Sequence, residues 1–210
     1  MSNDNLNQLV YSKNVVEFVT VANEFCKLIE NVNNYSVKAN LQNLQKIMPL
    51  LYLKATLLPK TEKIIEEELE KYVSDLDYNS LHQKWLQSLN EYDNYYEVFD
   101  PNIQFGDEMV TASISESLLD IYQDLKDFLI AYSLGDEEIM NDSLYDCVYH
   151  FEDFWGQRLV NLLRAVHMLV YGNVDFEENR NNKEIKPGTG NPEWLDKFWG
   201  TETEEDSKNV

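Results

Sequence analysis

The chain has 210 residues, of which 43% are hydrophobic, and its formal net charge is −21. The last 38 residues, 173–210, carry 10 acidic and 5 basic side chains, so most of the negative charge belongs to the preceding part of the chain. Such a charge repels nucleic-acid phosphates and anionic lipids, and we therefore expect no direct contact with nucleic acid or membrane.

Apolar residues recur three and four positions apart along the first 172 residues, and no alternating strand pattern appears. The first helix is best defined by Val15, Phe18, Val19, Ala22, Phe25, Cys26 and Ile29. The second begins near Ser36 and ends at Pro59. Its apolar stripe continues across Pro49, which predicts one kinked helix, with two shorter helices as the alternative.

Two weaker helical patterns follow. Thr61 is expected to cap an acidic segment whose apolar residues are Ile65, Leu69 and Tyr72. The next helix is predicted to begin at Ser80, which is spaced from Gln83 as in a capping box, and to continue to Phe99, before Pro101. Residues 100–112 are predicted to form a loop.

The last part of the predicted bundle is strongly helical. Ser113 and Glu116 form a second capping-box pair, and Gly135 closes the helix that they open. Residues 136–171 have a helical pattern throughout, ending at Gly172. We expect a break near Asn141-Asp142, because both residue types favour helix caps.

The composition changes after residue 172. We predict a helical bundle domain over 1–172 and an acidic, partly disordered tail over 173–210. Within the tail, Asn191 is placed to cap a short helix over 192–199. That helix presents Trp194, Leu195, Phe198 and Trp199, and these side chains are candidate binding residues that need a surface on which to dock. Overall, the fold class is all-α: an irregular bundle of five or six helices with a short appended C-terminal helix.

Arg158 lies inside the apolar stripe of the last long helix, where the pattern calls for a hydrophobic residue. An unpaired buried guanidinium is unfavourable, so a carboxylate must lie nearby, and Glu30 or Asp124 could supply it. One interpretation is a structural ion pair at the rim of the bundle. The alternative is an anion-binding pocket, formed by Arg158 with Trp155 and Tyr122.

The sequence offers no recognisable catalytic or metal-binding cluster. Glu116, Asp120 and Asp127 share a phase opposite the apolar stripe of their helix and are expected to face solvent. None of the three histidines follows a glutamate at the Glu-x-x-His spacing, and no Gly-x-Ser-x-Gly or phosphate-binding loop occurs. We therefore predict no metal and no cofactor, and a non-enzymatic protein is favoured.

The functional hypotheses concern binding. The main one is a protein-interaction module that uses an aromatic groove or the tail helix. The tail helix could dock on the bundle of the same chain, on a second subunit or on another protein. A homo-oligomer is one of these outcomes. The acidic surface would select a basic partner or simply keep the protein soluble. The alternatives are the anion pocket near Trp155 and Arg158, with binding or enzymatic activity, and an acidic mimic of nucleic acid.

The cellular compartment is inferred from three features. The N-terminus lacks a basic and then apolar signal pattern, and no run of about 18 uninterrupted apolar residues occurs. Cys26 and Cys147 fall in apolar phase on different predicted helices, which indicates buried thiols rather than a disulfide. A soluble cytoplasmic protein is expected.

Several segments together resemble a known family. They are "VANEFCKLIE", "MPLLYLKATLLP", "YDNYYEVFDP", "SISESLLDIYQDLKDFLIAYSLG" and "FWGQRLVNLLRAVHMLVYG". Their order and spacing are similar to those of an uncharacterised family of all-helical bacterial proteins, domain of unknown function 5063. The resemblance covers about residues 15–172 and omits the tail. It implies a compact helical domain in bacteria, and it supplies no activity, substrate or catalytic residue.

Overall fold

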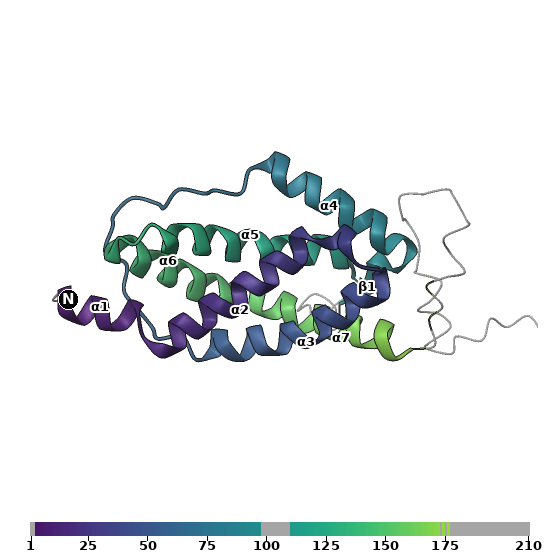
Figure 1. The fold of residues 1–210 in the computed structure, drawn as a ribbon, viewed down its shortest axis with the longest axis horizontal. Helices are drawn as coiled ribbons and strands as arrows, with labels where there is room; N and C mark the ends of the chain where they lie inside the picture. Colours follow the sequence, from purple (N-terminus) through teal and green to yellow (C-terminus); the bar gives the residue numbers. More distant parts are fainter. Residues whose placement is uncertain (1–2, 98–109, 173, 175, 177–210) are drawn as a thin grey trace, which may run out of the picture.

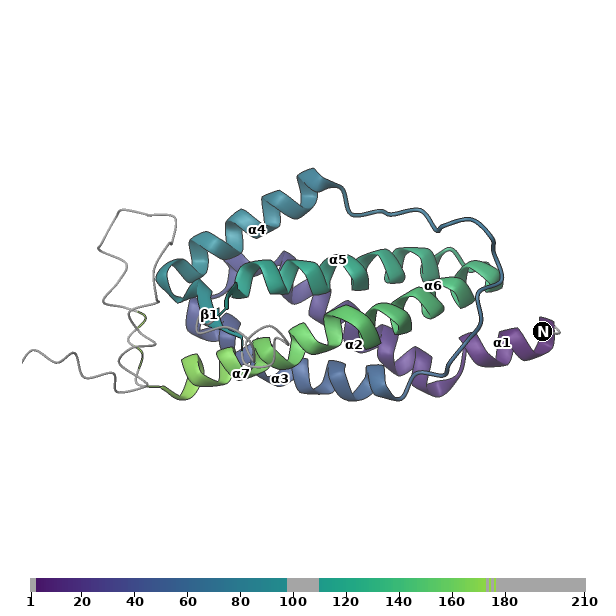
Figure 2. The same cartoon turned by 180° about the vertical axis from the view of Figure 1, so that it is seen from behind.

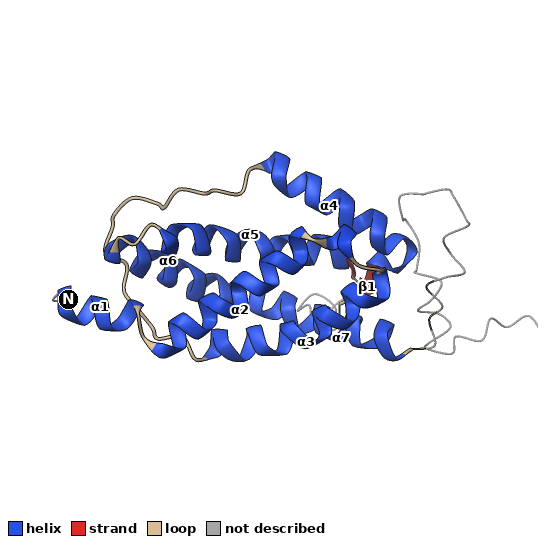
Figure 3. Cartoon of the chain, viewed as in Figure 1, coloured by secondary structure: helices blue, strands red, loops and turns tan. Residues whose placement is uncertain are grey.

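The structure, a computed structural model, describes residues 3–97, 110–172, 174 and 176. Helices dominate these residues and pack lengthwise into one elongated bundle (Figures 1 and 3), which confirms the all-α prediction. The helices are α1 (Asn3–Val10), α2 (Lys13–Glu30), α3 (Val37–Thr56), α4 (Asp75–Leu89), α5 (Ile114–Ser133), α6 (Glu137–His150) and α7 (Gly156–Tyr171). Short 3-10 turns, η1 (Val32–Asn34) and η2 (Asn90–Asp93), flank α3 and α4. No helix of the described part of the chain is long and apolar enough to cross a membrane.

The core lies where α2, α3, α5 and α7 meet. α2 packs against α3 and α5, and α3 packs in turn against α7. The largest fully buried side chains include Phe18, Phe25, Leu44, Met48, Leu118, Trp85 and Trp155. Cys26 and Cys147 are both buried free thiols, as predicted. The apolar stripes seen in the sequence are therefore the surfaces along which these helices pack.

α3 is a single helix that contains Pro49, as the sequence indicated. The side chain of Ser36 caps its first turn by accepting a hydrogen bond from the Ala39 amide at 3.3 Å. Its buried side is formed by Asn40, Leu41, Leu44, Met48, Leu51 and Ala55.

The predicted helical segment after Thr61 is wrong. Residues 57–74, here called the strap, have no regular secondary structure; they run around the end of the bundle where α5 meets α6 and then along α5 (Figures 1 and 2). A helix here would place like charges from "EEELE" on neighbouring turns, and the strap's amides bind side chains of α5 and α6 instead. α4 consequently begins earlier than predicted, at Asp75, with the Ser74 side chain accepting from the Asp77 amide.

The helix predicted to reach Phe99 ends at Leu89, because Asn90 adopts a positive φ of 52°. A small hairpin that the sequence analysis did not predict follows: β1 (Asn94–Tyr96) pairs antiparallel with β2 (Thr111–Ser113), and Tyr95 faces Ala112. Buried Asp93 fixes this junction, since its carboxylate accepts from the amide of Ser115 at 2.8 Å. That contact joins the hairpin to the first turn of α5.

The break in the predicted 136–171 helix occurs at a different place from the one expected. A π-helical turn, η4 (Phe151–Trp155), separates α6 from α7, whereas Asn141 and Asp142 lie inside α6. Gly156 follows this turn, and a Cβ there would collide with the carbonyl oxygen of Phe151 and lie 2.9 Å from its ring. The glycine is therefore required by a close approach of its own chain.

Candidate functional site

Arg158 does form an ion pair, but with a carboxylate that the sequence analysis did not choose. Its Nη1 lies 3.0 Å from Oδ2 of Asp120 on α5. The guanidinium also lies over the ring of Phe154, 4.4 Å from the centroid. Tyr78 of α4 donates to the other oxygen of Asp120 at 2.8 Å. Asp120 thus links α4, α5 and α7.

The two carboxylates expected near Arg158 have other partners. Glu30 accepts from the hydroxyl of Tyr122 at 3.0 Å and from Nζ of Lys126 at 2.7 Å. Burial, followed by the charge of Glu30, raises the pKa of Tyr122 above its ordinary value. Asp124 lies 2.9 Å from Nδ1 of His150.

Trp155 is fully buried, and its indole nitrogen donates to the carbonyl oxygen of Cys147 at 3.3 Å. The predicted binding residues Trp155, Arg158, Tyr122 and Asp124 therefore contact four different partners, which are Cys147, Asp120, Glu30 and His150 respectively. The other three, Trp194, Phe198 and Trp199, lie outside the described residues.

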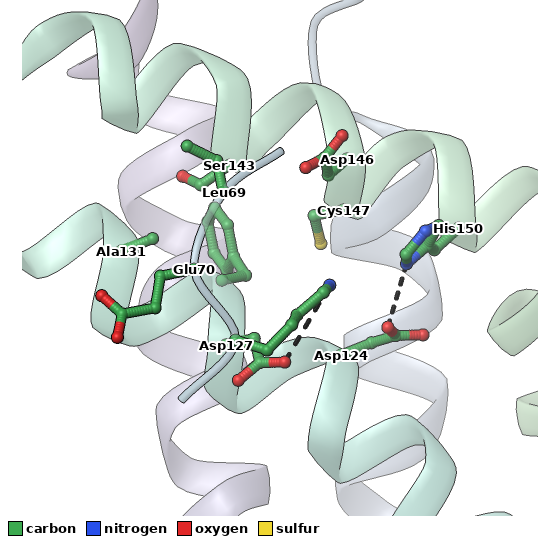
Figure 4. Close-up of a pocket in the computed structure, with 11 residues that line it drawn as sticks. Leu69, Glu70, Asp124, Asp127, Ala131, Ser143, Asp146, Cys147 and His150 are labelled. Atoms are coloured by element: carbon green, nitrogen blue, oxygen red, sulfur yellow. Dashed lines mark hydrogen bonds and ion pairs between the residues drawn. The ribbon is translucent and has the colours of Figure 1, made fainter. Parts of the chain in front are cut away.

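A shallow hollow lies between the strap, α5 and α6 (Figure 4). Its empty volume is about 320 Å³, part of which is open solvent. Its walls carry four carboxylates and two basic side chains, those of Lys71 and His150. The lining residues are Leu69, Glu70, Lys71, Asp124, Asp127, Phe128, Ala131, Ser143, Asp146, Cys147 and His150.

Burial and pairing shift the pKa values of three titratable groups of the hollow. The hydrogen bond to Asp124 raises the pKa of His150 and favours its charged form. Burial raises the pKa of Asp146, and it raises that of the Cys147 thiol well above its usual value. A thiol held in its neutral form is a poor nucleophile. No group of three or more side chains in the described part of the chain could hold a metal ion.

Two buried carboxylates hold the strap in place. Asp127, which is only 6% exposed, accepts from the amides of Tyr72 and Val73 at 2.7 and 2.9 Å. Asp142, which is fully buried, accepts from Ile64 and Ile65 at 2.9 and 2.7 Å. The prediction that Asp127 faces solvent is wrong, because helical phase alone did not reveal that a loop covers that side of α5.

The exposed side of α3 is the least expected surface. Leu50 and Leu53 of α3 and Leu57, the first residue of the strap, are 42%, 52% and 44% exposed, and their spacing places them in one row along the helix and its C-terminal cap. Lys46, one turn before Leu50, extends the row with a positive charge. We call these four residues the α3 surface. Tyr52, also on α3, is 39% exposed, and other exposed apolar side chains of the described part of the chain, such as Leu76, stand on other elements.

The charge of α3 also differs from that of the rest of the protein. Residues 37–56 contain Lys38, Lys46 and Lys54 and no acidic residue, within a chain of net charge −21. Lys54 is paired with Glu17 of α2 at 2.6 Å, whereas Lys38 and Lys46 are exposed. α3 is therefore a locally basic, apolar helix on an acidic molecule.

The sequence analysis followed only the buried stripe of α3 and did not single out these leucines. The signal was present in residues 47–58, "IMPLLYLKATLL", where apolar residues occupy nearly every side of the helix. A helix that is apolar all round is normally covered on all sides. Here α2 and α7 cover the inner side, and the α3 surface stays exposed.

The described residues thus form a helical bundle in which Asp127 and Asp142 hold the strap and the α3 surface is exposed. The chain belongs to the family described as "Domain of unknown function (DUF5063)", whose model matches residues 9–172. It is also similar to protein BF1032 from Bacteroides fragilis, known from a crystal structure. The two share 43% identity with a TM-score of 0.70, over 79% of this chain and 97% of that one. Comparison with curated proteins gives no match.

Proposed function

We propose that this protein is a non-enzymatic protein-interaction module, and that the α3 surface binds an acidic, amphipathic segment of a partner. The single observation that carries the proposal is the row formed by Leu50, Leu53 and Leu57 on the outside of the bundle. Single exposed leucines are common on protein surfaces, but a contiguous apolar row is typical of interaction sites.

The apolar contribution of the three leucines is one part of the binding free energy. Each of the three leucines leaves about half of its surface in water, and covering that area contributes on the order of 1 kcal/mol per side chain. Together they offer roughly 3 kcal/mol before the loss of rotational and translational freedom is subtracted. A complex therefore also needs charged contacts and further apolar contacts, which an amphipathic helix lying along α3 could supply.

The charge distribution selects the partner. Although the whole chain is acidic, the exposed lysines Lys38 and Lys46 make α3 locally positive. A partner segment with carboxylates beside its apolar residues would match this helix, while the rest of the acidic surface would repel acidic proteins that lack the apolar match.

The alternative of an anion pocket at Arg158 has less support, because that guanidinium is already paired with Asp120 and stacked on Phe154.

The test replaces Leu53 by a photo-crosslinking amino acid in the full chain, produced in its native cell. The control places the same group at Leu76 of α4, which is 79% exposed and distant in the sequence from α3. We expect position 53 to crosslink to an acidic, apolar segment of another protein, identified by mass spectrometry. Lys46→Glu should reduce the yield several-fold. Equal crosslinking at positions 53 and 76, or a yield unaffected by Lys46→Glu, would overturn the proposal.

A further inference from the structure

We propose that the chain's own C-terminal segment, residues 191–200, docks on the α3 surface and competes there with the partner. This inference rests on the proposed function, since it names a regulator of the same surface. In this arrangement the tail occupies the α3 surface, and a partner must displace the tail in order to bind.

The first argument is chemical complementarity. The segment "NPEWLDKFWG" carries Trp194, Leu195, Phe198 and Trp199, which form an apolar side if the segment is helical. Residues 191–200 contain 2 acidic side chains and 1 basic one, and the adjoining residues 201–210 add 4 acidic and 1 basic, whereas α3 has three lysines and no acidic residue. The segment thus has both properties that the α3 surface selects: a large apolar side and negative charge.

The second argument is reach. α7 lies beside α3, and the side chains of His167 and Gln45 approach to 3.5 Å. From these two positions, Gly172 is five residues along α7 and Leu53 is eight residues along α3. At 1.5 Å per residue the two points are separated by about 20 Å along the bundle axis.

The connecting chain is long enough to cross that separation. Residues 173–190 connect Gly172 to the segment, and Phe176 among them contacts the ring of Tyr92. A flexible chain of this length has a typical end-to-end distance on the order of 20 Å and an upper limit of about 60 Å. Docking in cis is therefore favoured by a high effective concentration and needs no exceptional affinity.

The experiment uses the full chain with Thr201→Cys carrying a spin label, and observes the leucine methyl groups by NMR. The label can be attached selectively, because Cys26 and Cys147 are buried and burial raises the pKa of both thiols. We expect a several-fold loss of signal at Leu50, Leu53 and Leu57. Leucines far from α3 in the sequence and exposed elsewhere serve as references.

A matched variant separates docking from chance proximity. Trp194→Glu combined with Phe198→Glu removes the apolar match and leaves the bundle unchanged, so the signals of the three leucines should recover. Contact between molecules is measured in a mixture of two kinds of chain. One kind carries the spin label and no isotope label, and the other carries the isotope label and no spin label. Loss of signal only in that mixture, or no loss at α3 in the full chain, overturns docking in cis.

The two proposals fail in different ways. If the tail docks in cis, the Trp194→Glu and Phe198→Glu variant should also increase crosslinking from position 53 to the partner several-fold. A partner crosslink whose yield does not respond to this variant would leave the interaction module intact and overturn the competition. Loss of the leucine signals without any partner crosslink would support the docked tail and overturn the proposed function.

Discussion

Replacement of Asp142 by asparagine should release one end of the strap. The carboxylate is fully buried and accepts from the amides of Ile64 and Ile65, and from the side-chain nitrogen of Asn141 at 2.9 Å. An asparagine offers one oxygen in place of two, so its NH₂ group would face a donor. Hydrogen bonds to a charged group contribute about 1.5–3 kcal/mol each. Because the neutral amide also relieves the desolvation of the charge, we expect a net loss of about 2–3 kcal/mol.

Hydrogen exchange of the backbone amides shows which part of the protein loses stability in the Asp142→Asn variant. The strap is a loop on the outside of the bundle, so it should open locally before the core unfolds. A local loss of about 2–3 kcal/mol corresponds to roughly 30- to 150-fold faster exchange at the amide of Ile65. Amides in the middle of α2, such as that of the buried Phe25, should change much less, since their exchange requires the core to open.

Asp146→Asn is the matched control. Asp146 lies one helical turn after Asp142 on α6 and lines the hollow, and burial raises its pKa, so the charged form is disfavoured in the fold. Its neutral analogue should leave exchange at Ile65 within a few-fold of the wild type at neutral pH. Equal effects of the two substitutions, or an unchanged rate in Asp142→Asn, would refute the idea that amide hydrogen bonds to a buried carboxylate hold the strap.

Three further predictions concern other contacts. Gly156→Ala should destabilise the protein by about 1–3 kcal/mol in urea unfolding, because the new Cβ would collide with the π-turn. The same change in an ordinary helix is stabilising, so a more stable variant would contradict this prediction. The pKa of His150 is raised by Asp124, so their pair stabilises the fold below pH 6.5 and loses that contribution as the pH rises through the folded-state pKa. Asp124→Asn should lower the NMR titration midpoint of His150, and an unchanged midpoint would exclude the pair as the cause. A double-mutant cycle of Arg158→Leu and Asp120→Asn should give a coupling of about 1 kcal/mol in the free energy of unfolding. A coupling near zero would mean that Arg158 acts through its contact with the ring of Phe154 and not through the ion pair.

The helices that the sequence analysis placed correctly are those whose pattern is local. The capping pair Ser113 and Glu116 marks the start of α5, with the amide of Glu116 donating to the Ser113 hydroxyl at 3.0 Å. Gly135, with a φ of 77°, follows its end. In both cases the residues that determine the boundary are neighbours in the chain, so a single sequence contains the necessary information.

The candidate sites were harder to predict because they depend on which surfaces become covered. Asp127 was placed in solvent by its phase, but the strap crosses that side of α5. Arg158 was correctly expected to need a carboxylate, yet the choice of Asp120 depends on how α7 lies against α5. Leu53 was overlooked because a leucine in an apolar helix is expected to be buried, and only the positions of the neighbouring helices show that it is exposed.

The sequence by itself determined the helical character of the chain, the buried stripe of each main helix and the excess of negative charge, since these follow from residue types and their spacing along one chain. Only the tertiary structure decided that a stretch without helix would clasp α5 and α6, and that one side of an all-round apolar helix would stay in water. The physical reason is that burial is a property of pairs of surfaces: a side chain can show that it is apolar, but only its neighbours determine whether it is covered.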